Sequence, residues 1–117
     1  MKTDFSVSLA KEVAGERAAV TLDVGPLGTL LKPIGTLSFD DAYDAFAELI
    51  RAGQGVDMIS IETMTDTYEL KAAVLAAKEN ASVPILATVS IDENGRLLTG
   101  ANLESVVSLL EGLGVDA

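Results

Sequence analysis

The sequence predicts an α/β fold: about three parallel βα units of a (βα)8 barrel (a partial TIM barrel) behind an N-terminal helix stub. Apolar, β-branched runs alternate with stretches of helical period, which indicates parallel strands joined by helical crossovers. The run centres, near positions 20, 59 and 86, bracket the spacing of about 31 residues per unit in a barrel of about 250 residues. We expect residues 1–117 to form a single incomplete domain, because this length suits one small domain at most.

Three strands are expected from the apolar runs, and each run is apolar on one face only. The runs are Ala18–Val24, Val56–Glu62 and Val83–Ile91. The apolar face carries Val20, Leu22, Val24, Ile59, Ile61, Ile85, Ala87, Val89 and Ile91, and the other face carries Thr21, Asp23, Ser60, Glu62, Thr88 and Ser90. Strands covered on both faces are almost continuously hydrophobic, so this pattern favours a barrel whose polar face meets a ligand. The alternative is a single layer whose polar face lies in water.

Four helices are expected from the remaining periodic stretches. Met1–Gly15 has the pattern of a short amphipathic helix that ends at its glycine. Its apolar positions are Val7, Leu9, Ala10 and Val13. Ser38 and Asp66 each stand three positions before an acidic residue, a capping-box spacing that predicts a helix start. The helix after Asp66 is expected to end near Asn80, and the last helix is expected to begin near Asn102.

A turn sequence and a repeated tripeptide mark the last third of the chain. Asp92-Glu93-Asn94-Gly95 is a strong tight-turn signal, and we expect Ile91 to Leu98 to form a small hairpin. Gly55-Val56-Asp57 leads into the second strand, and Gly114-Val115-Asp116 repeats it, so a fourth strand is expected to begin there. Because closure needs about eight strands, three units describe a truncated barrel with open edges through which self-association is expected.

Composition narrows the classes of function. Eight Lys and Arg against eighteen Asp and Glu give a net charge of −10, which disfavours nucleic acid and anionic membranes as partners. The chain has no Cys and no His, so it offers no thiolate or imidazole metal site and no Ser-His or Cys-His pair. The longest apolar runs fall short of the roughly 18–20 residues of a membrane span, and the N-terminus is too polar for a secretory signal, so a cytoplasmic protein is expected.

Three carboxylates follow the ends of successive strands: Asp23, Glu62 and Asp92. Parallel barrels build their active sites at this rim. Glu62 falls on the polar face, beside the start of a helix whose amides can bind anions. It is the leading candidate to bind a substrate ammonium group. The competing interpretation is a carboxylate that caps the next helix or is solvated. For Asp23 the following Gly25-Pro26 favours a turn role.

Two neighbouring features are expected to matter less for chemistry. The loop Gly25–Gly35 lacks a phosphate-binding motif, and we expect it to form a wall or lid beside the site. Lys71 and Lys78 are expected to be solvated charges on helix surfaces.

Several motifs occur in series along the chain. They are Asp23-Val-Gly-Pro-Leu-Gly28, Lys32-Pro-Ile-Gly35, Ser38-Phe-Asp-Asp-Ala-Tyr43, Ile61-Glu-Thr-Met64, Glu69-Leu-Lys-Ala-Ala-Val-Leu-Ala-Ala-Lys78, Asp92-Glu-Asn-Gly-Arg96 and Leu98-Thr-Gly100. In this order and spacing they resemble the homocysteine-binding barrel of the homocysteine S-methyltransferase family, which includes a domain of cobalamin-dependent methionine synthase. The resemblance runs from about Leu9 to Ala117.

This resemblance implies an eightfold barrel in which zinc, held by cysteine thiolates, activates homocysteine to take a methyl group from a donor such as methylcobalamin, giving methionine. It implies that Glu62 holds the homocysteine amino group and that Gly25 and Pro26 lie in a loop beside that pocket. Asp23 is a further substrate-binding candidate. The family's zinc cysteines belong to later strands, so this chain is expected to bind no cofactor and to be inactive alone.

Two further hypotheses remain open. The chain is a non-catalytic partial-barrel module or engineered scaffold that associates with itself, or it is a small enzyme that relies on carboxylates alone. In the second case Asp23, Glu62 and Asp92 serve as acid and base.

Overall fold

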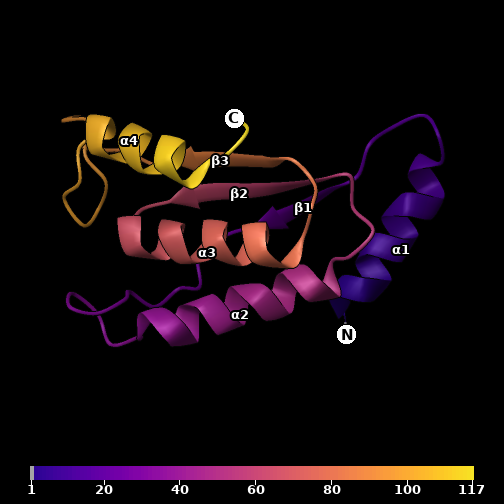
Figure 1. The fold of residues 1–117 in the computed structure, drawn as a ribbon, viewed down its shortest axis with the longest axis horizontal. Coiled ribbons are helices and arrows are strands. Elements are labelled where there is room, and N and C mark those ends of the chain that lie inside the picture. The colour runs from indigo at the N-terminus through magenta and orange to yellow at the C-terminus, as the bar shows by residue number, and fades with distance from the viewer. Residues whose placement is uncertain (1) are drawn as a thin grey trace.

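The computed structural model describes residues 2–117, in which three parallel strands alternate with four helices (Figure 1). The elements are α1 (Lys2–Ala14), β1 (Thr21–Val24), α2 (Phe39–Ala52), β2 (Met58–Met64), α3 (Thr67–Asn80), β3 (Ile85–Val89) and α4 (Leu103–Leu113). The predicted α/β class and parallel pairing are confirmed, and the sheet is compatible with part of a barrel. Met1, the first residue of the predicted N-terminal helix, lies outside the described residues.

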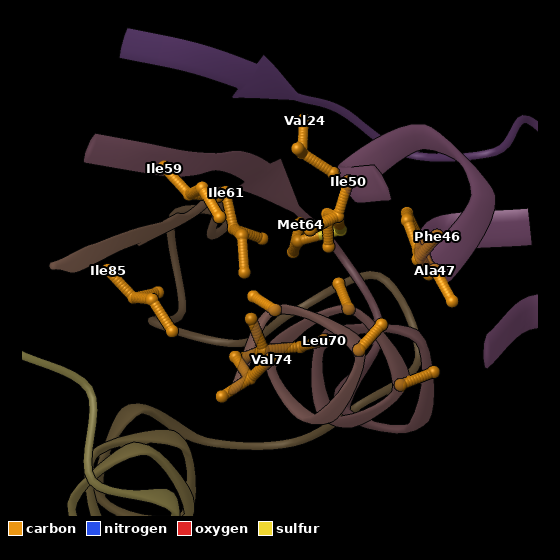
Figure 2. Packing of buried hydrophobic residues seen from close by; sticks show 14 of the residues in the cluster. Val24, Phe46, Ala47, Ile50, Ile59, Ile61, Met64, Leu70, Val74 and Ile85 are labelled. Atoms are coloured by element: carbon orange, nitrogen blue, oxygen red, sulfur yellow. The ribbon is translucent and has the colours of Figure 1, made fainter. Parts of the chain in front are cut away.

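The strands pair in the order β1-β2-β3, with the predicted apolar positions in register. Leu22 lies opposite Ile59, which in turn lies opposite Ile85. Ile59, Ile61 and Ile85 point from the strands toward α3 (Figure 2). The apolar face of the sheet is therefore the inner face of the core, as the alternation of residue types predicts.

Helices α2 and α3 complete this core. Phe46 and Ile50 of α2 are buried, as are Leu70 and Val74 of α3, whose side chains lie close to those of the strands (Figure 2). Burial of such a side chain contributes about 1.5–3 kcal/mol. The many alanines of α3 allow α2 and the sheet to approach it closely, because Ala72, Ala73, Ala76 and Ala77 are all buried.

The predicted helix starts form as side-chain caps. Ser38 Oγ accepts a hydrogen bond from the Asp41 amide at 3.1 Å, and Asp66 Oδ2 accepts one from the Glu69 amide at 3.0 Å. Asn102 caps α4 in the same way. Each cap provides a partner for an amide that the helix itself leaves free.

The outer helices leave part of their apolar sides uncovered. On α1 the buried residue is Val7, whereas Leu9 and Val13 are exposed, as is Phe5. The helix was predicted correctly, but Leu9 and Val13 of its predicted apolar face are exposed, because α1 contacts α2 only lightly and a hollow lies between α1 and β1. On α4 Val107 is exposed too.

The predicted hairpin over Ile91 to Leu98 is wrong. The turn forms, with the Asp92 amide donating to the Arg96 carbonyl at 2.9 Å. However, β3 ends at Val89, and the described residues between β3 and α4 contain no strand. The reason is local, because Asp92 Oδ1 accepts from the amides of Asn94 and Arg96 and so replaces the partners that a second strand would supply.

The segment after α4 returns along the free edge of β3. The Ala117 amide donates to the Ile85 carbonyl at 3.3 Å, and the Ala87 amide donates to the Ala117 carbonyl at 2.8 Å. This slanted pattern is that of a parallel pair. The direction and place are those expected for the beginning of a fourth strand.

None of the helices within residues 2–117 combines the length and the hydrophobicity that crossing a membrane requires.

Candidate functional site

The polar face of the sheet brings two of the predicted carboxylates together. Asp23 of β1 lies opposite Ser60 of β2, two residues before Glu62. Ser60 Oγ donates a hydrogen bond to Glu62 Oε1 at 2.9 Å. The Glu62 side chain lies close enough to Asp23 to raise the pKa of the Asp23 carboxyl. Ser60 is buried, Glu62 is half-buried and Asp23 is exposed. The result is a pair of carboxyl groups anchored on one side by a buried hydroxyl.

The surroundings of Asp23 disfavour its ionised form. The pKa of Asp23 is raised above its ordinary value, first by the loss of hydration against the sheet and then by its hydrogen bond to Glu62 and the charge of that residue. A nearby negative charge disfavours ionisation of a carboxyl group, so the charge of Glu62 favours the protonated form of Asp23. A cation placed between the two carboxylates offsets this effect.

An irregular backbone follows Glu62 directly. Thr63 has φ of 57°, and the pairing of β2 with β3 shifts register between Ile61 and Met64. A β-branched residue in the left-handed region costs on the order of 1–3 kcal/mol and persists where its surroundings hold it. Here the Thr63 amide donates to Thr88 Oγ1 at 3.0 Å, and Thr63 Oγ1 donates to the Glu62 carbonyl at 2.7 Å. This irregularity fixes the direction of the chain at the candidate carboxylate.

The loop that contains Gly25 and Pro26 is tied to the N-terminal turn of α3. The Leu27 amide donates to Glu69 Oε1 at 2.6 Å, and the Glu69 side chain is almost fully buried. Burial raises the pKa of Glu69, the Leu27 amide lowers it, and the charge of Asp66 raises it again. A cavity of about 240 Å³ lies between this loop, α3 and Leu98. The loop therefore forms a wall at the rim of the sheet, as expected.

Asp66 joins the same corner to the loop after β3. Besides capping α3, its Oδ1 accepts a hydrogen bond from Thr99 Oγ1 at 2.9 Å. The carboxylate is 4% exposed. Through Asp66 and Glu69 the start of α3 holds both the loop after β1 and the loop after β3.

Asp92 does not join the pair. Its side chain is exposed and accepts hydrogen bonds from the amides of its own turn. The hypothesis of an enzyme with Asp23, Glu62 and Asp92 as acid and base therefore does not hold for Asp92, because its carboxylate binds amides of its own turn.

A sequence model of the homocysteine S-methyltransferase family matches residues 3–117. The chain belongs to the homocysteine S-methyltransferase family. It is 31% identical to a methionine synthase of Mycobacterium tuberculosis over 122 residues, and 30% identical to that of Mycobacterium leprae over 121 residues. It is 28% identical over 120 residues to homocysteine S-methyltransferase 1 of Saccharomyces cerevisiae.

The chain spans a small part of these relatives. The matches cover 93%, 92% and 95% of this chain but 10%, 10% and 37% of the respective relatives. The family resemblance read from the sequence motifs is confirmed. The activity named for the relatives belongs to those longer proteins.

Zinc, which the family implies, does not fit the side chains present in this chain. The sequence has no Cys and no His, and no group of three or more His, Cys, Asp or Glu within residues 2–117 could hold a metal ion. The carboxylate pair supplies hard oxygen donors from two residues, whereas zinc sites that bind thiols use soft thiolate or imidazole ligands.

Sequence reasoning missed several residues that shape this homocysteine S-methyltransferase rim. Ser60 and Thr88 were placed on the polar face without a role, and Thr63 carried no signal of a left-handed backbone. Glu69 was interpreted as a capping residue, because it stands three positions after Asp66. Its amide does bind the Asp66 cap, but its carboxylate binds the loop instead.

Proposed function

We propose that this chain forms the amino-group side of a homocysteine-binding site within a (βα)8 barrel, of which residues 1–117 are one incomplete part. In this proposal Glu62 and Asp23 accept hydrogen bonds from the homocysteine ammonium group, and Gly25 and Pro26 line the adjoining wall. The observation that carries the proposal is geometric: Asp23 lies opposite Ser60 on the paired strand, and Ser60 Oγ donates to Glu62 Oε1 at 2.9 Å, so both carboxylates lie on the polar face of the sheet.

The chemistry of the pair suits an ammonium ion. An ammonium group has three N–H donors and a positive charge, and charge-assisted hydrogen bonds are about twice as strong as neutral ones. When an ammonium ion lies between the two carboxylates, its positive charge offsets the repulsion between them. Ser60 continues to donate to Glu62 Oε1 and fixes its orientation.

Methyl transfer is assigned to the complete family domain and not to this polypeptide. Activation of a thiol by zinc needs ligands that this sequence does not contain. We therefore propose that the 117-residue chain binds the amino-acid end of its substrate and does not turn it over alone.

The test is a binding comparison between L-homocysteine and 4-mercaptobutyrate, which lacks only the amino group. Isothermal calorimetry should show weaker binding of 4-mercaptobutyrate. Glu62→Gln should weaken homocysteine binding by about 10-fold or more, because a hydrogen bond to a charged group contributes about 1.5–3 kcal/mol. Glu93→Gln is the control, because Glu93 is exposed in the Asp92 turn. Equal affinities for the two ligands, or an unchanged affinity in Glu62→Gln, would refute the proposal.

A second candidate function is a self-associating partial-barrel module. It is favoured by the exposed Phe5, Leu9 and Val13, which follow one another by about one helical turn along α1, and by the position of β1 at the edge of the sheet. Light scattering should then show a defined oligomer that Leu9→Ser disrupts. A monomer at all concentrations excludes this candidate.

A further inference from the structure

A groove on the helical side of the molecule lies apart from the carboxylate pair. It is formed where the N-terminal parts of α2 and α3 meet the loop before α2, and its volume is about 630 Å³. Volumes of about 300–1,000 Å³ are typical of sites for small organic ligands. The walls are largely apolar, with Phe39 of α2 and Tyr68 and Leu75 of α3 among them.

Local sequence explains how the groove forms. Tyr68, Lys71 and Leu75 stand at positions i, i+3 and i+7 of α3 and so share one helical face. Opposite them, the Lys32 amide donates to the Leu37 carbonyl at 2.8 Å, which closes the loop that carries Lys32 and Pro33. Leu31, next in the chain, is buried in the core and anchors that loop.

The charge of the groove differs from that of the whole chain. The net charge is −10, yet the groove carries Lys32 and Lys71 and none of its lining residues is acidic. Within residues 2–117 neither lysine has a hydrogen bond or ion pair from its ammonium group, whereas Lys11 binds Asp57 and Lys78 binds the Gly114 carbonyl. Lys71 is exposed, as expected, and it also lies at the edge of this apolar groove.

We propose that this groove binds a small organic anion with a flat apolar body, such as an aromatic carboxylate. The aromatic rings of Phe39 and Tyr68 provide surface for the body, and the ammonium groups of Lys32 and Lys71 provide donors for the carboxylate. The proposal is independent of the homocysteine site.

The experiment is a titration of the ¹⁵N-labelled chain with 2-naphthoate, followed by two-dimensional NMR. Chemical-shift changes should concentrate in residues 32–39 and 68–75. The neutral isostere 2-naphthamide should bind more weakly. Lys32→Gln and Lys71→Gln should each weaken 2-naphthoate binding by about 2–5-fold, the range expected for solvent-exposed ion pairs. Lys2→Gln removes the same charge from α1 and should leave the affinity unchanged.

Several outcomes overturn the proposal. These are the absence of shift changes up to the solubility limit of 2-naphthoate, changes centred on Asp23 and Glu62, and equal binding of the acid and the amide. Unchanged affinity in both lysine variants also counts against it. Both lysines are exposed, so the spectra of the free variants should show an intact fold and make each result interpretable.

Discussion

Asp57 and Asp116 make the same two hydrogen bonds to the neighbouring strand. The Asp57 amide donates to the Val20 carbonyl at 2.8 Å, and the Val20 amide donates to Asp57 Oδ2 at 2.7 Å. The Asp116 amide donates to the Ile85 carbonyl at 2.9 Å, and the Ile85 amide donates to Asp116 Oδ2 at 2.9 Å. The two copies of the Gly-Val-Asp sequence thus make the same contacts, one directly before β2 and the other beside the free edge of β3.

The first prediction concerns Asp57, which also receives both hydrogen bonds of the Lys11 ammonium group at 2.8 Å. Asp57→Ala should lower the urea midpoint more than Asp116→Ala, because it removes the ion pair as well as the strand contact. The hydrogen bond from Lys11 and then that from Val20 lower the pKa of Asp57 below 3.8. The stability from Asp57 is therefore present above pH 3.8 and is lost as pH falls through the lowered value.

The matched test for that ion pair is Lys11→Gln. Lys11→Gln should lower the urea midpoint by less than Asp57→Ala does. This effect should disappear at high salt, because salt screens an exposed ion pair. Equal midpoints for Asp57→Ala and Asp116→Ala would contradict the ranking.

The second prediction concerns the bond between Glu69 and Leu27. Glu69→Ala should destabilise the chain by about 1–3 kcal/mol, because the mutation removes a buried acceptor and its contacts. Hydrogen exchange of the Leu27 amide should become faster. Glu69→Gln should keep that amide protected, because its carbonyl oxygen can accept the same bond.

The pH dependence of Glu69 has a defined sign. Its pKa is raised above 4.5, mainly by burial, so the folded chain binds this proton more tightly than the unfolded chain does. The resulting stability is present below pH 4.5 and is lost as pH rises through the folded value. The stability of Glu69→Gln, measured by urea unfolding, should therefore increase relative to that of the parent chain as pH rises. A constant difference between the two would show that Glu69 does not titrate in this way.

The third prediction concerns the backbone at Thr63. Thr63→Asn should raise stability by about 0.5–1 kcal/mol, because asparagine tolerates a positive φ better than a β-branched residue. Thr63→Val keeps the branch but loses the hydrogen bond to the Glu62 carbonyl, and should lower stability by about 0.5–1.5 kcal/mol. Thermal unfolding of the two variants measures both effects. The same sign of change in both would be evidence against backbone strain.

The fourth prediction compares two glycines of one loop. A Cβ at Gly35 would lie 1.9 Å from the Leu30 carbonyl oxygen, so Gly35→Ala must displace backbone and should cost about 1–3 kcal/mol or more. A Cβ at Gly25 would meet nothing within 4 Å, and Gly25→Ala should change stability by less than about 0.5 kcal/mol. Chemical denaturation measures the stability of both variants. Similar losses of stability in Gly35→Ala and Gly25→Ala would contradict the close approach of Gly35 to Leu30.

Much of the fold follows from local patterns. Alternation of apolar and polar residues identified all three strands and the face that each presents to the core. Ser38, Asp66 and Asn102 marked the helix starts, because a short polar side chain before an apolar period provides a partner for free amides. Asp23 and Glu62 were placed on one face by the same alternation, since successive side chains of a strand point to opposite sides.

Contacts between distant segments decided the remainder. The Glu69 carboxylate could have returned to its own helix end, but it bound Leu27, 42 residues away. The spacing of residues in a chain specifies which face a side chain occupies and how a helix begins. Which donor a side chain meets, and where two lysines border one groove, depends on how segments remote in the sequence pack together.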